Sequence, residues 1–282
     1  MAAAPVWECG PHAFDLSRPL VMGVLNVTPD SFSDGGEFLD PVAAFSRGLE
    51  MVEAGVAMVD VGGESTRPGA DATQVAEELA RIRPVVASLA EGDVCVSVDT
   101  RHAQVAAACV TAGAQVINDI GGFRDPAMRE VAAGCNAGLV VMHMRGEPET
   151  MQDEPTYTDV VAQVGSWLVR QAQLLEFAGV AHGRIVIDPG IGFGKSVEHN
   201  LELLRRLPDL ATLGYPILVG ASRKRFLGLI TGEREPRRRL AESLAAAVWA
   251  VGNGASVVRV HDVSATVRAL QVASAIAGGV PR

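Results

Sequence analysis

The chain has 282 residues, of which 48% are hydrophobic, and we expect a single domain with one large core over residues 1–282. A formal net charge of −9 argues against nucleic acid or an anionic membrane as a partner, because both attract a basic surface. The four cysteines have no zinc-like spacing, which predicts reduced thiols. We find no leader pattern and no apolar run of ~18 residues, and therefore expect a cytoplasmic protein.

Short β-branched runs alternate along the chain with longer Ala- and Leu-rich segments of helical period. The expected strands cover, in chain order, residues 20–25, 56–61, 94–98, 115–118, 139–142, 185–187, 217–219 and 256–260. The expected helices cover residues 41–53, 73–89, 103–112, 158–178, 199–207, 240–251 and 265–277. This alternation predicts an α/β protein whose strands are parallel.

Eight β/α units in a chain of 282 residues predict a TIM (β/α)8 barrel. A doubly wound open sheet is the alternative, but its nucleotide-binding form needs a G-x-G-x-x-G spacing that residues 26–36 lack. Residues 1–19 form an N-terminal extension that we expect to pack on the barrel or lead into it. Residues 145–156 are polar and contain proline, which predicts a surface loop over the barrel mouth or an ordered excursion.

In such a barrel, side chains at the carboxyl ends of the strands face one mouth. All eight expected strands lead into a polar or sulfur-containing side chain, among them Asn26, Ser65, Thr66, Arg67, Asp99, Asn118, Met142, Asp188, Lys224, Arg225, Arg259 and His261. Each of these residues taken alone has an ordinary structural explanation. Polar groups at every strand end together indicate a functional site.

Some polar residues near the strand ends are better explained by structure than by function. A carboxylate after a strand commonly caps the next helix, and we interpret Asp119 and Asp262 in this way. His143 lies between two methionines and is interpreted as a packed histidine. The three arginines at 237–239 are interpreted as a solvated charge cluster.

The remaining strand-end residues suit a heterocycle that carries a phosphate. A carboxylate accepts paired hydrogen bonds from a guanidine-like ring edge, and Asp99, Asn118 and Asp188 supply such a set. Arg259 and His261, with the loop at 65–67, offer donors and positive charge for a phosphate or diphosphate. Near them, the amide oxygen of residue 26 suits a Mg²⁺ ion that keeps most of its waters.

Several motifs resemble those of the dihydropteroate synthase family over about residues 20–273. They are GVLNVTPDSFS at 23–33, DVGGESTRP at 60–68, SVDT at 97–100, DPG at 188–190, GFGK at 192–195, GASRK at 220–224 and RVHD at 259–262. The resemblance implies a TIM barrel, usually a homodimer, that joins 6-hydroxymethyl-7,8-dihydropterin diphosphate to p-aminobenzoate. It also implies that the C–O bond breaks before the amine attacks.

The resemblance further implies a role for each matching residue. Pterin diphosphate would contact Thr66, Asp99, Asn118, Met142, Asp188, Lys224, Arg259 and His261, of which Asp99, Lys224, Arg259 and His261 would be catalytic. Asn26 would bind Mg²⁺, and p-aminobenzoate would contact Pro68, Phe193, Lys224 and Arg225. Sulfonamides imitate p-aminobenzoate and are expected inhibitors. Two mobile loops would close over the site, with Thr28, Pro29, Asp30, Ser31 and Phe32 in one and Ser65 and Arg67 in the other.

One residue of the proposed p-aminobenzoate site, Arg225, departs from the family's motif. Many relatives carry serine where this chain has Arg225, so we expect the p-aminobenzoate carboxylate to be held by backbone N–H groups at the following helix or by the guanidinium. We also hypothesise that Asp30 and Arg67 pair when the loops close.

Two alternative functions remain open. One is a corrinoid-type pterin methyltransferase, which has no need of the 26–30 or 222–224 motifs. The other is a catalytically silent paralogue, which would be expected to have lost strand-end groups.

Overall fold

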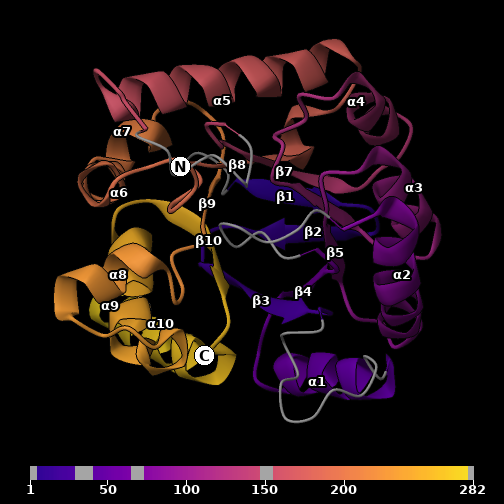
Figure 1. The fold of residues 1–282 in the computed structure, drawn as a ribbon, viewed down its shortest axis with the longest axis horizontal. Helices are drawn as coiled ribbons and strands as arrows, with labels where there is room; N and C mark the ends of the chain where they lie inside the picture. The colour runs from indigo at the N-terminus through magenta and orange to yellow at the C-terminus, as the bar shows by residue number, and fades with distance from the viewer. Residues whose placement is uncertain (1–4, 29–40, 65–72, 147–154, 279–282) are drawn as a thin grey trace.

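The computed structural model describes residues 5–28, 41–64, 73–146 and 155–278. Within these residues, the parallel strands are β3 (Leu20–Asn26), β4 (Met58–Gly62), β5 (Val96–Asp99), β6 (Val116–Asp119), β7 (Gly138–Met142), β8 (Ile185–Asp188), β9 (Ile217–Val219) and β10 (Ala255–Val260). They close into a barrel in the order β10-β3-β4-β5-β6-β7-β8-β9. Helices surround the strands (Figure 1). The predicted TIM barrel is confirmed, and each of the eight strands lies where the sequence predicts it.

The helices that cover the barrel are α1 (Pro41–Glu53), α2 (Val75–Glu91), α3 (Ala103–Thr111), α4 (Pro126–Ala133), α5 (Val160–Phe177), α6 (Val197–Arg205), α7 (Leu207–Ala211), α8 (Arg225–Thr231), α9 (Leu240–Gly252) and α10 (Val263–Ile276). Each helix that the sequence predicts begins and ends within two residues of the prediction. The prediction missed α4, α7 and α8. These helices have eight, five and seven residues, too few to show a repeated apolar period.

The barrel interior is organised by the alternation of side chains along each strand. Seven strands each contribute one buried apolar residue to an inner layer at the amino end, namely Met22, Met58, Val116, Val140, Val186, Leu218 and Val257. Successive side chains of a strand point to opposite faces, so the residue two positions further along also faces inward. In four of these strands that residue is Asp60, Asn118, Asp188 or Arg259. One face of the strands therefore carries a core layer at one end and polar groups at the other.

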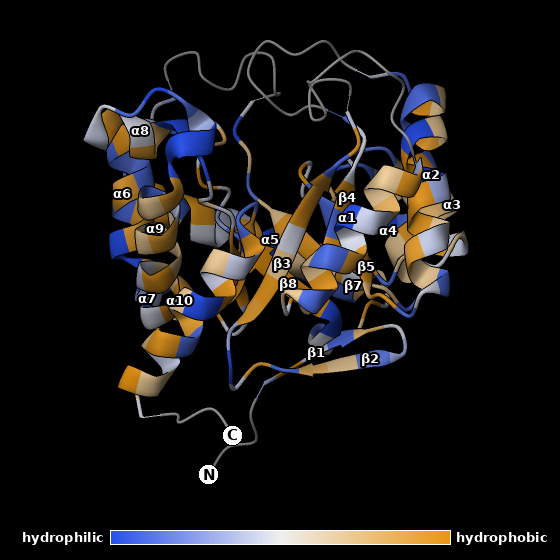
Figure 2. Ribbon diagram, turned by 90° about the horizontal axis from the view of Figure 1, so that it is seen from below, coloured by the Kyte–Doolittle hydropathy of each residue, from blue (hydrophilic) through white to orange (hydrophobic). Residues whose placement is uncertain are grey.

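A two-stranded hairpin covers the amino end of the barrel. Its strands β1 (Val6–Cys9) and β2 (His12–Asp15) pair antiparallel, and Trp7 and Cys9 are fully buried against the inner layer. The Trp7 indole donates a 3.0 Å hydrogen bond from Nε1 to the carbonyl oxygen of Arg184. Figure 2 shows the hairpin below the barrel strands. The sequence does not predict these two strands, because four residues are too few to show a clear alternation of apolar and polar side chains.

All four cysteines are free thiols, three of them buried and Cys135 partly buried. This agrees with the predicted absence of a disulfide framework in so large a chain. None of the helices that the structure describes has the length and apolar content needed to cross a lipid bilayer.

Candidate active site

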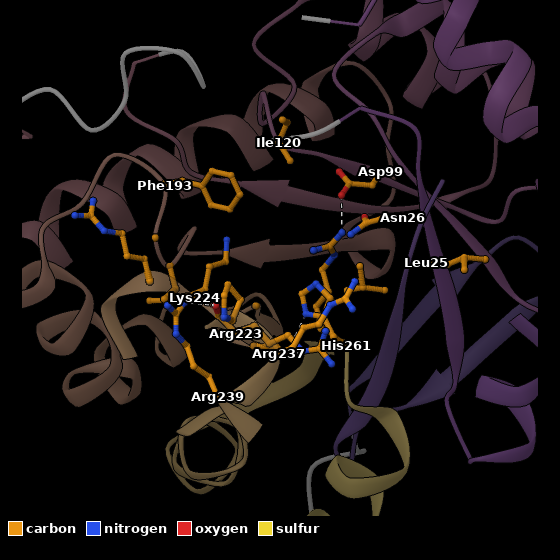
Figure 3. A pocket seen from close by; sticks show the side chains of 18 of the residues that line it. Leu25, Asn26, Asp99, Ile120, Phe193, Arg223, Lys224, Arg237, Arg239 and His261 are labelled. Atoms are coloured by element: carbon orange, nitrogen blue, oxygen red, sulfur yellow. Dashed lines mark hydrogen bonds and ion pairs between the residues drawn. The ribbon is translucent and has the colours of Figure 1, made fainter. Parts of the chain in front are cut away.

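A cavity of about 1460 Å³ opens at the carboxyl ends of the barrel strands. It is lined by every predicted site residue that the structure describes, namely Asn26, Thr28, Asp99, Asn118, Met142, Asp188, Phe193, Lys224, Arg225, Arg259 and His261. Figure 3 shows Asn26, Asp99, Phe193, Lys224 and His261 arranged around this space. The predicted residues Pro29, Asp30, Ser31, Phe32, Ser65, Thr66, Arg67 and Pro68 lie outside the described residues, as does the hypothetical pairing of Asp30 with Arg67.

The guanidinium of Arg259 binds two carboxylates on the floor of the cavity. Its Nε lies 2.6 Å from Oδ2 of Asp60, and its Nη2 lies 2.5 Å from Oδ2 of Asp99, the contact drawn as a dashed line in Figure 3. Asn118 donates from Nδ2 to the same Asp60 oxygen at 3.1 Å. Charge-assisted bonds of this kind fix orientation strongly. The network therefore links β4, β5, β6 and β10 and fixes their relative positions beneath the mouth of the barrel.

Burial and charge set the protonation of this network. Burial raises the pKa of Asp99 to about 7, although the positive charge of Arg259 opposes the rise. Burial would lower the pKa of Arg259, but the charges of Asp60 and Asp99 raise it, so the guanidinium stays protonated. The site thus contains a permanent cation in contact with a carboxyl group whose pKa is raised by burial.

Two residues of the cavity region that the sequence did not indicate are Asp60 and Ile120. Asp60 is fully buried, and it was overlooked because it lies in the middle of an apolar strand rather than at its end. A lone carboxylate in a run such as Met-Val-Asp-Val-Gly is itself a signal, because a buried charge requires a partner. Ile120 was also missed, and it forms a small apolar cluster at the mouth with Met142, Met144 and Phe193.

Lys224 and Asp188 also line the cavity, and the charge of each acts on the pKa of the other. The Nζ atom of Lys224 lies 3.8 Å from the centroid of the Phe193 ring, within cation–π distance. Burial lowers the pKa of Lys224 to about 8, while the charge of Asp188 opposes this. Burial raises the pKa of Asp188 to about 6, although its Oδ1 accepts a 2.7 Å hydrogen bond from the Gly190 N–H. The Asp188 carboxylate therefore stabilises the turn that follows β8 and also lines the cavity.

The segments after β9 and β10 are joined by side chains beside the cavity. Nδ1 of His261 lies 3.1 Å from Oγ of Ser222, and the guanidinium of Arg223 contacts both Asp262 oxygens, at 3.0 and 2.5 Å. Burial, with the charge of Arg259, lowers the pKa of His261 to about 3, so its ring is neutral. The interpretation of Asp262 as a capping side chain is wrong: it occupies the N-cap position of α10, but its carboxylate makes no cap bond and pairs with Arg223 instead.

Two other interpretations from the sequence also need correction. Asp119 accepts hydrogen bonds from the N–H groups of Gly121 at 2.7 Å and Phe123 at 2.6 Å, so it organises a turn, and Asp125 caps α4. Arg239 is buried and donates to the carbonyl oxygens of Glu233, Arg223 and Arg234, so it is not part of a solvated cluster. In both cases a buried backbone required partners that the local sequence does not reveal.

Glu64, Glu78 and His102 have ligand atoms within 4.8 Å of one another, a spacing compatible with a metal. Most of their polar atoms already have strong partners, although Oε1 of Glu78 is buried without a hydrogen-bond partner. Arg101 donates to both oxygens of Glu64, at 3.1 and 3.0 Å, and Nδ1 of His102 lies 2.7 Å from Glu78. We interpret this group as an ion-pair cluster beyond the carboxyl end of β4, where Glu64 lies.

His143 is a packed histidine, as predicted from the sequence. It is 6% exposed, and its ring meets the edge of Trp167 at a centroid distance of 5.0 Å. Its Nδ1 lies 3.0 Å from Nζ of Lys195. Burial, with the charge of Lys195, lowers the pKa of His143 to about 2, so the ring stays neutral in the folded protein at ordinary pH.

The buried neutral ring predicts a pH effect on stability. The pKa of His143 rises toward 6.5 on unfolding, so its contribution is fully present above pH 6.5 and is lost as the pH falls below that value. Between about pH 7.5 and about pH 5 the loss amounts to about 2 kcal/mol of unfolding free energy. We expect His143→Gln to lose about 2 kcal/mol less than the wild type over this interval in urea unfolding. Equal pH dependence in both proteins would contradict this account.

Comparison with known proteins identifies the family. The pterin binding enzyme family model matches residues 22–261. The chain is 46% identical over 264 residues to dihydropteroate synthase of Escherichia coli K12, with 93% of each chain covered. It superimposes with a TM-score of 0.92 on the Xanthomonas albilineans dihydropteroate synthase with 4-aminobenzoic acid, at 46% identity with 98% and 99% of the two chains covered. The Yersinia pestis enzyme in a sulfonamide drug complex gives a TM-score of 0.92 at 41% identity, with 97% and 100% covered. The chain therefore belongs to the dihydropteroate synthases, a family of pterin-binding transferases.

Proposed function

We propose that the cavity binds 6-hydroxymethyl-7,8-dihydropterin diphosphate and p-aminobenzoate and converts them to 7,8-dihydropteroate and diphosphate. The observation that carries this proposal is the convergence of two chemically different sets of groups in one cavity. The carboxylates and amide of Asp99, Asn118 and Asp188 suit a pterin edge, and Arg259 and His261 suit a diphosphate. The transferase activity of the family requires both.

Recognition of the pterin ring follows from the hydrogen-bonding capacity of the floor. The ring presents a guanidine-like N–H and NH2 edge, which carboxylates accept. Asp188 and Asp99 offer oxygens, Asn118 offers an amide that both donates and accepts, and Lys224 offers a donor. Met142 is 3% exposed at the mouth and provides an apolar surface for the flat ring.

Catalysis follows from charge complementarity rather than from a side-chain nucleophile. Arg259 stays protonated and stabilises the diphosphate as negative charge builds on it, and the neutral His261 donates a hydrogen bond to it. As the C–O bond breaks, positive charge spreads over the pterin, and the carboxylates of Asp99 and Asp188, which line the same cavity, would offset it. The amine of p-aminobenzoate then attacks the methylene carbon, forms the C–N bond and releases a proton to solvent. Thr66 would add a further hydroxyl contact to the diphosphate.

The side chain at the end of β3 fits a Mg²⁺ ion. Asn26 ends β3, lines the cavity and carries a neutral amide oxygen. Mg²⁺ takes few protein ligands and keeps waters and phosphate oxygens for the rest. Asn26 would hold the ion, which when bound supplies charge to the diphosphate.

We expect Asn26→Ala to raise the Mg²⁺ concentration needed for half-maximal activity by about tenfold or more, because one of few protein ligands is lost. The measurement is a Mg²⁺ titration of initial rates at saturating substrates. The KM for p-aminobenzoate should stay near the wild-type value. An unchanged Mg²⁺ requirement would remove Asn26 from the metal site.

The p-aminobenzoate site lies between the Phe193 ring and the start of α8. Phe193 is 9% exposed and forms an apolar wall beside Lys224. Arg225 is the first residue of α8, is exposed and lines the cavity, so its guanidinium is available to the carboxylate. A ligand of this shape would also be imitated by a sulfonamide, which we expect to inhibit the enzyme, with Pro68 contributing to the same wall.

Exposed apolar side chains on α8, α9 and α10 support the expectation of a homodimer. They are Leu229, Ile230, Leu240, Trp249, Val272 and Ile276. Exposed apolar surface favours association. Free cysteines throughout the chain are consistent with a cytoplasmic enzyme, which is where we place it.

The test is product formation from synthetic pterin diphosphate with Mg²⁺, with and without p-aminobenzoate. Formation of 7,8-dihydropteroate, detected by chromatography together with stoichiometric diphosphate, is the expected result. Pterin binding without product would contradict the proposal and favour a silent paralogue. Transfer of a methyl group from a pterin donor instead would favour the methyltransferase alternative.

A further inference from the structure

Lys195 carries a buried ammonium group that the proposed chemistry does not use. It ends the turn at 189–195 after β8 and is 3% exposed. Its Nζ lies 2.9 Å from the carbonyl oxygens of Gly190 and Phe193, and 3.0 Å from Nδ1 and 3.3 Å from the carbonyl oxygen of His143. All four of these acceptors are neutral. The ammonium is therefore a cation whose partners are three carbonyl dipoles and a ring nitrogen, all pointing at the same atom.

Convergence of this kind requires the backbone to be shaped around the cation. A buried ammonium is costly unless its donors are bonded, and neutral acceptors meet that need only when several point at one atom. Gly190 has a φ of 65°, and a Cβ there would lie 1.9 Å from the His143 carbonyl oxygen. Only glycine permits this close approach. The Lys195 ammonium thus ties the segment after β7 to the turn after β8.

The turn held in this way carries the aromatic wall of the proposed p-aminobenzoate site. The Phe193 N–H donates to the Gly190 carbonyl oxygen at 3.1 Å, and the Phe193 carbonyl oxygen accepts from Lys195 at 2.9 Å. Both backbone ends of Phe193 are therefore fixed. Its ring then lies 3.8 Å from Nζ of Lys224, measured to the ring centroid.

We propose that Lys195 is a positioning residue for p-aminobenzoate, whose ammonium holds the 190–193 turn so that Phe193 stands at the correct place beside Lys224. This inference rests on the proposed function. Lys195 acts through Phe193 and has almost no surface of its own to offer a substrate. The pterin side of the cavity depends on it less, because the backbone of Asp188 is paired within β8, although its carboxylate also accepts a hydrogen bond from the Gly190 N–H of this turn.

The first experiment compares the two Michaelis constants in Lys195→Met. We expect the KM for p-aminobenzoate, at saturating pterin diphosphate, to rise about tenfold or more, because small displacements of a positioning group have large effects. The KM for pterin diphosphate should change by less than about threefold. An unchanged KM for p-aminobenzoate, or an equal rise in both constants, overturns the inference. The wild type in the same assay tests the proposed function separately, since it alone must form dihydropteroate.

A double-mutant cycle tests whether Lys195 acts through the aromatic ring. In a Phe193→Ala background, Lys195→Met should add little to the KM for p-aminobenzoate, because the group it positions is absent. Effects of the two substitutions that multiply independently overturn the inference. Lys195→Gln, which keeps two N–H donors, should show a smaller change in the same direction and serves if the methionine variant does not fold.

Two controls separate positioning from general loss of stability. Val186→Ala removes core volume from the inner layer at the opposite end of the barrel, and it should leave both Michaelis constants unchanged. Burial lowers the pKa of Lys195, and the charges of Asp188 and Lys224 also act on it. Asp188 and Lys224 are present in both proteins, so the contribution of Lys195 is the difference between the pH profiles of the KM for p-aminobenzoate in the wild type and in Lys195→Met. Identical pH profiles for the two proteins count against the inference.

Discussion

Arg259→Met should reduce synthase activity to the limit of detection and lower the free energy of unfolding by about 3 to 5 kcal/mol. The substitution removes the cation that both Asp60 and Asp99 contact, at 2.6 and 2.5 Å, and leaves a fully buried carboxylate without its charged partner. Uncompensated buried charge is among the few mechanisms that produce so large an effect. Urea unfolding and the product assay measure the two consequences independently.

The double variant of Arg259→Met with Asp60→Asn distinguishes the structural from the catalytic contribution. Neutralising Asp60 removes most of the charge left unpaired, so the double variant should regain much of the lost stability. Its activity should stay lost, because the diphosphate still lacks its guanidinium. Arg205→Met, which removes an exposed arginine from a surface ion pair, should leave both quantities near wild type. Recovery of activity in the double variant would show that Arg259 does not act on the diphosphate.

Trp7→Ala should destabilise the barrel by about 3 to 5 kcal/mol without a matching loss of catalytic rate in the folded protein. The indole is fully buried between the hairpin and the inner layer, and the closed barrel leaves little freedom for the cavity to collapse. Thermal unfolding measures the stability, and the product assay at low temperature measures the site. Because the hairpin lies at the end of the barrel opposite the mouth, the Michaelis constants should be unchanged.

Two further variants refine this prediction. Trp7→Phe keeps most of the packing but loses the Nε1 hydrogen bond to Arg184, so its effect should be intermediate. Val6→Ala on the same strand, where the side chain is 45% exposed, should change stability by less than about 0.5 kcal/mol. A Trp7→Ala protein as stable as the wild type would show that the hairpin does not contribute to closure of the barrel.

The barrel and the strand-end residues of the cavity were predictable because both follow from local periodicity. Strands of a β/α unit are continuous apolar runs, and the polar residue at the end of each run is visible in the sequence. Asn118 and Asp188 were recognised in this way. The rule depends only on the position of a residue in its strand.

Two of the residues that were missed or misinterpreted depend on partners far away in the sequence. Asp60 lies 199 positions from Arg259, and the carboxylate of Asp262 pairs with Arg223 rather than capping the helix that follows it. Arg239 resembles its exposed neighbours until the fold surrounds it with backbone carbonyls. No local pattern distinguishes these cases, because the same side chain is suitable as a cap, a solvated charge or a buried partner.

The link between Arg259 and the two carboxylates also bears on the order in which the protein is completed during synthesis. Asp60 and Asp99 belong to β4 and β5, whereas the guanidinium arrives only with β10, the last strand of the barrel. A nascent chain that has reached β9 therefore contains two acidic groups aimed at one interior and no cation between them. Repulsion between these groups opposes burial until the final strand supplies the charge. Closure of the barrel and assembly of the catalytic site are then the same event.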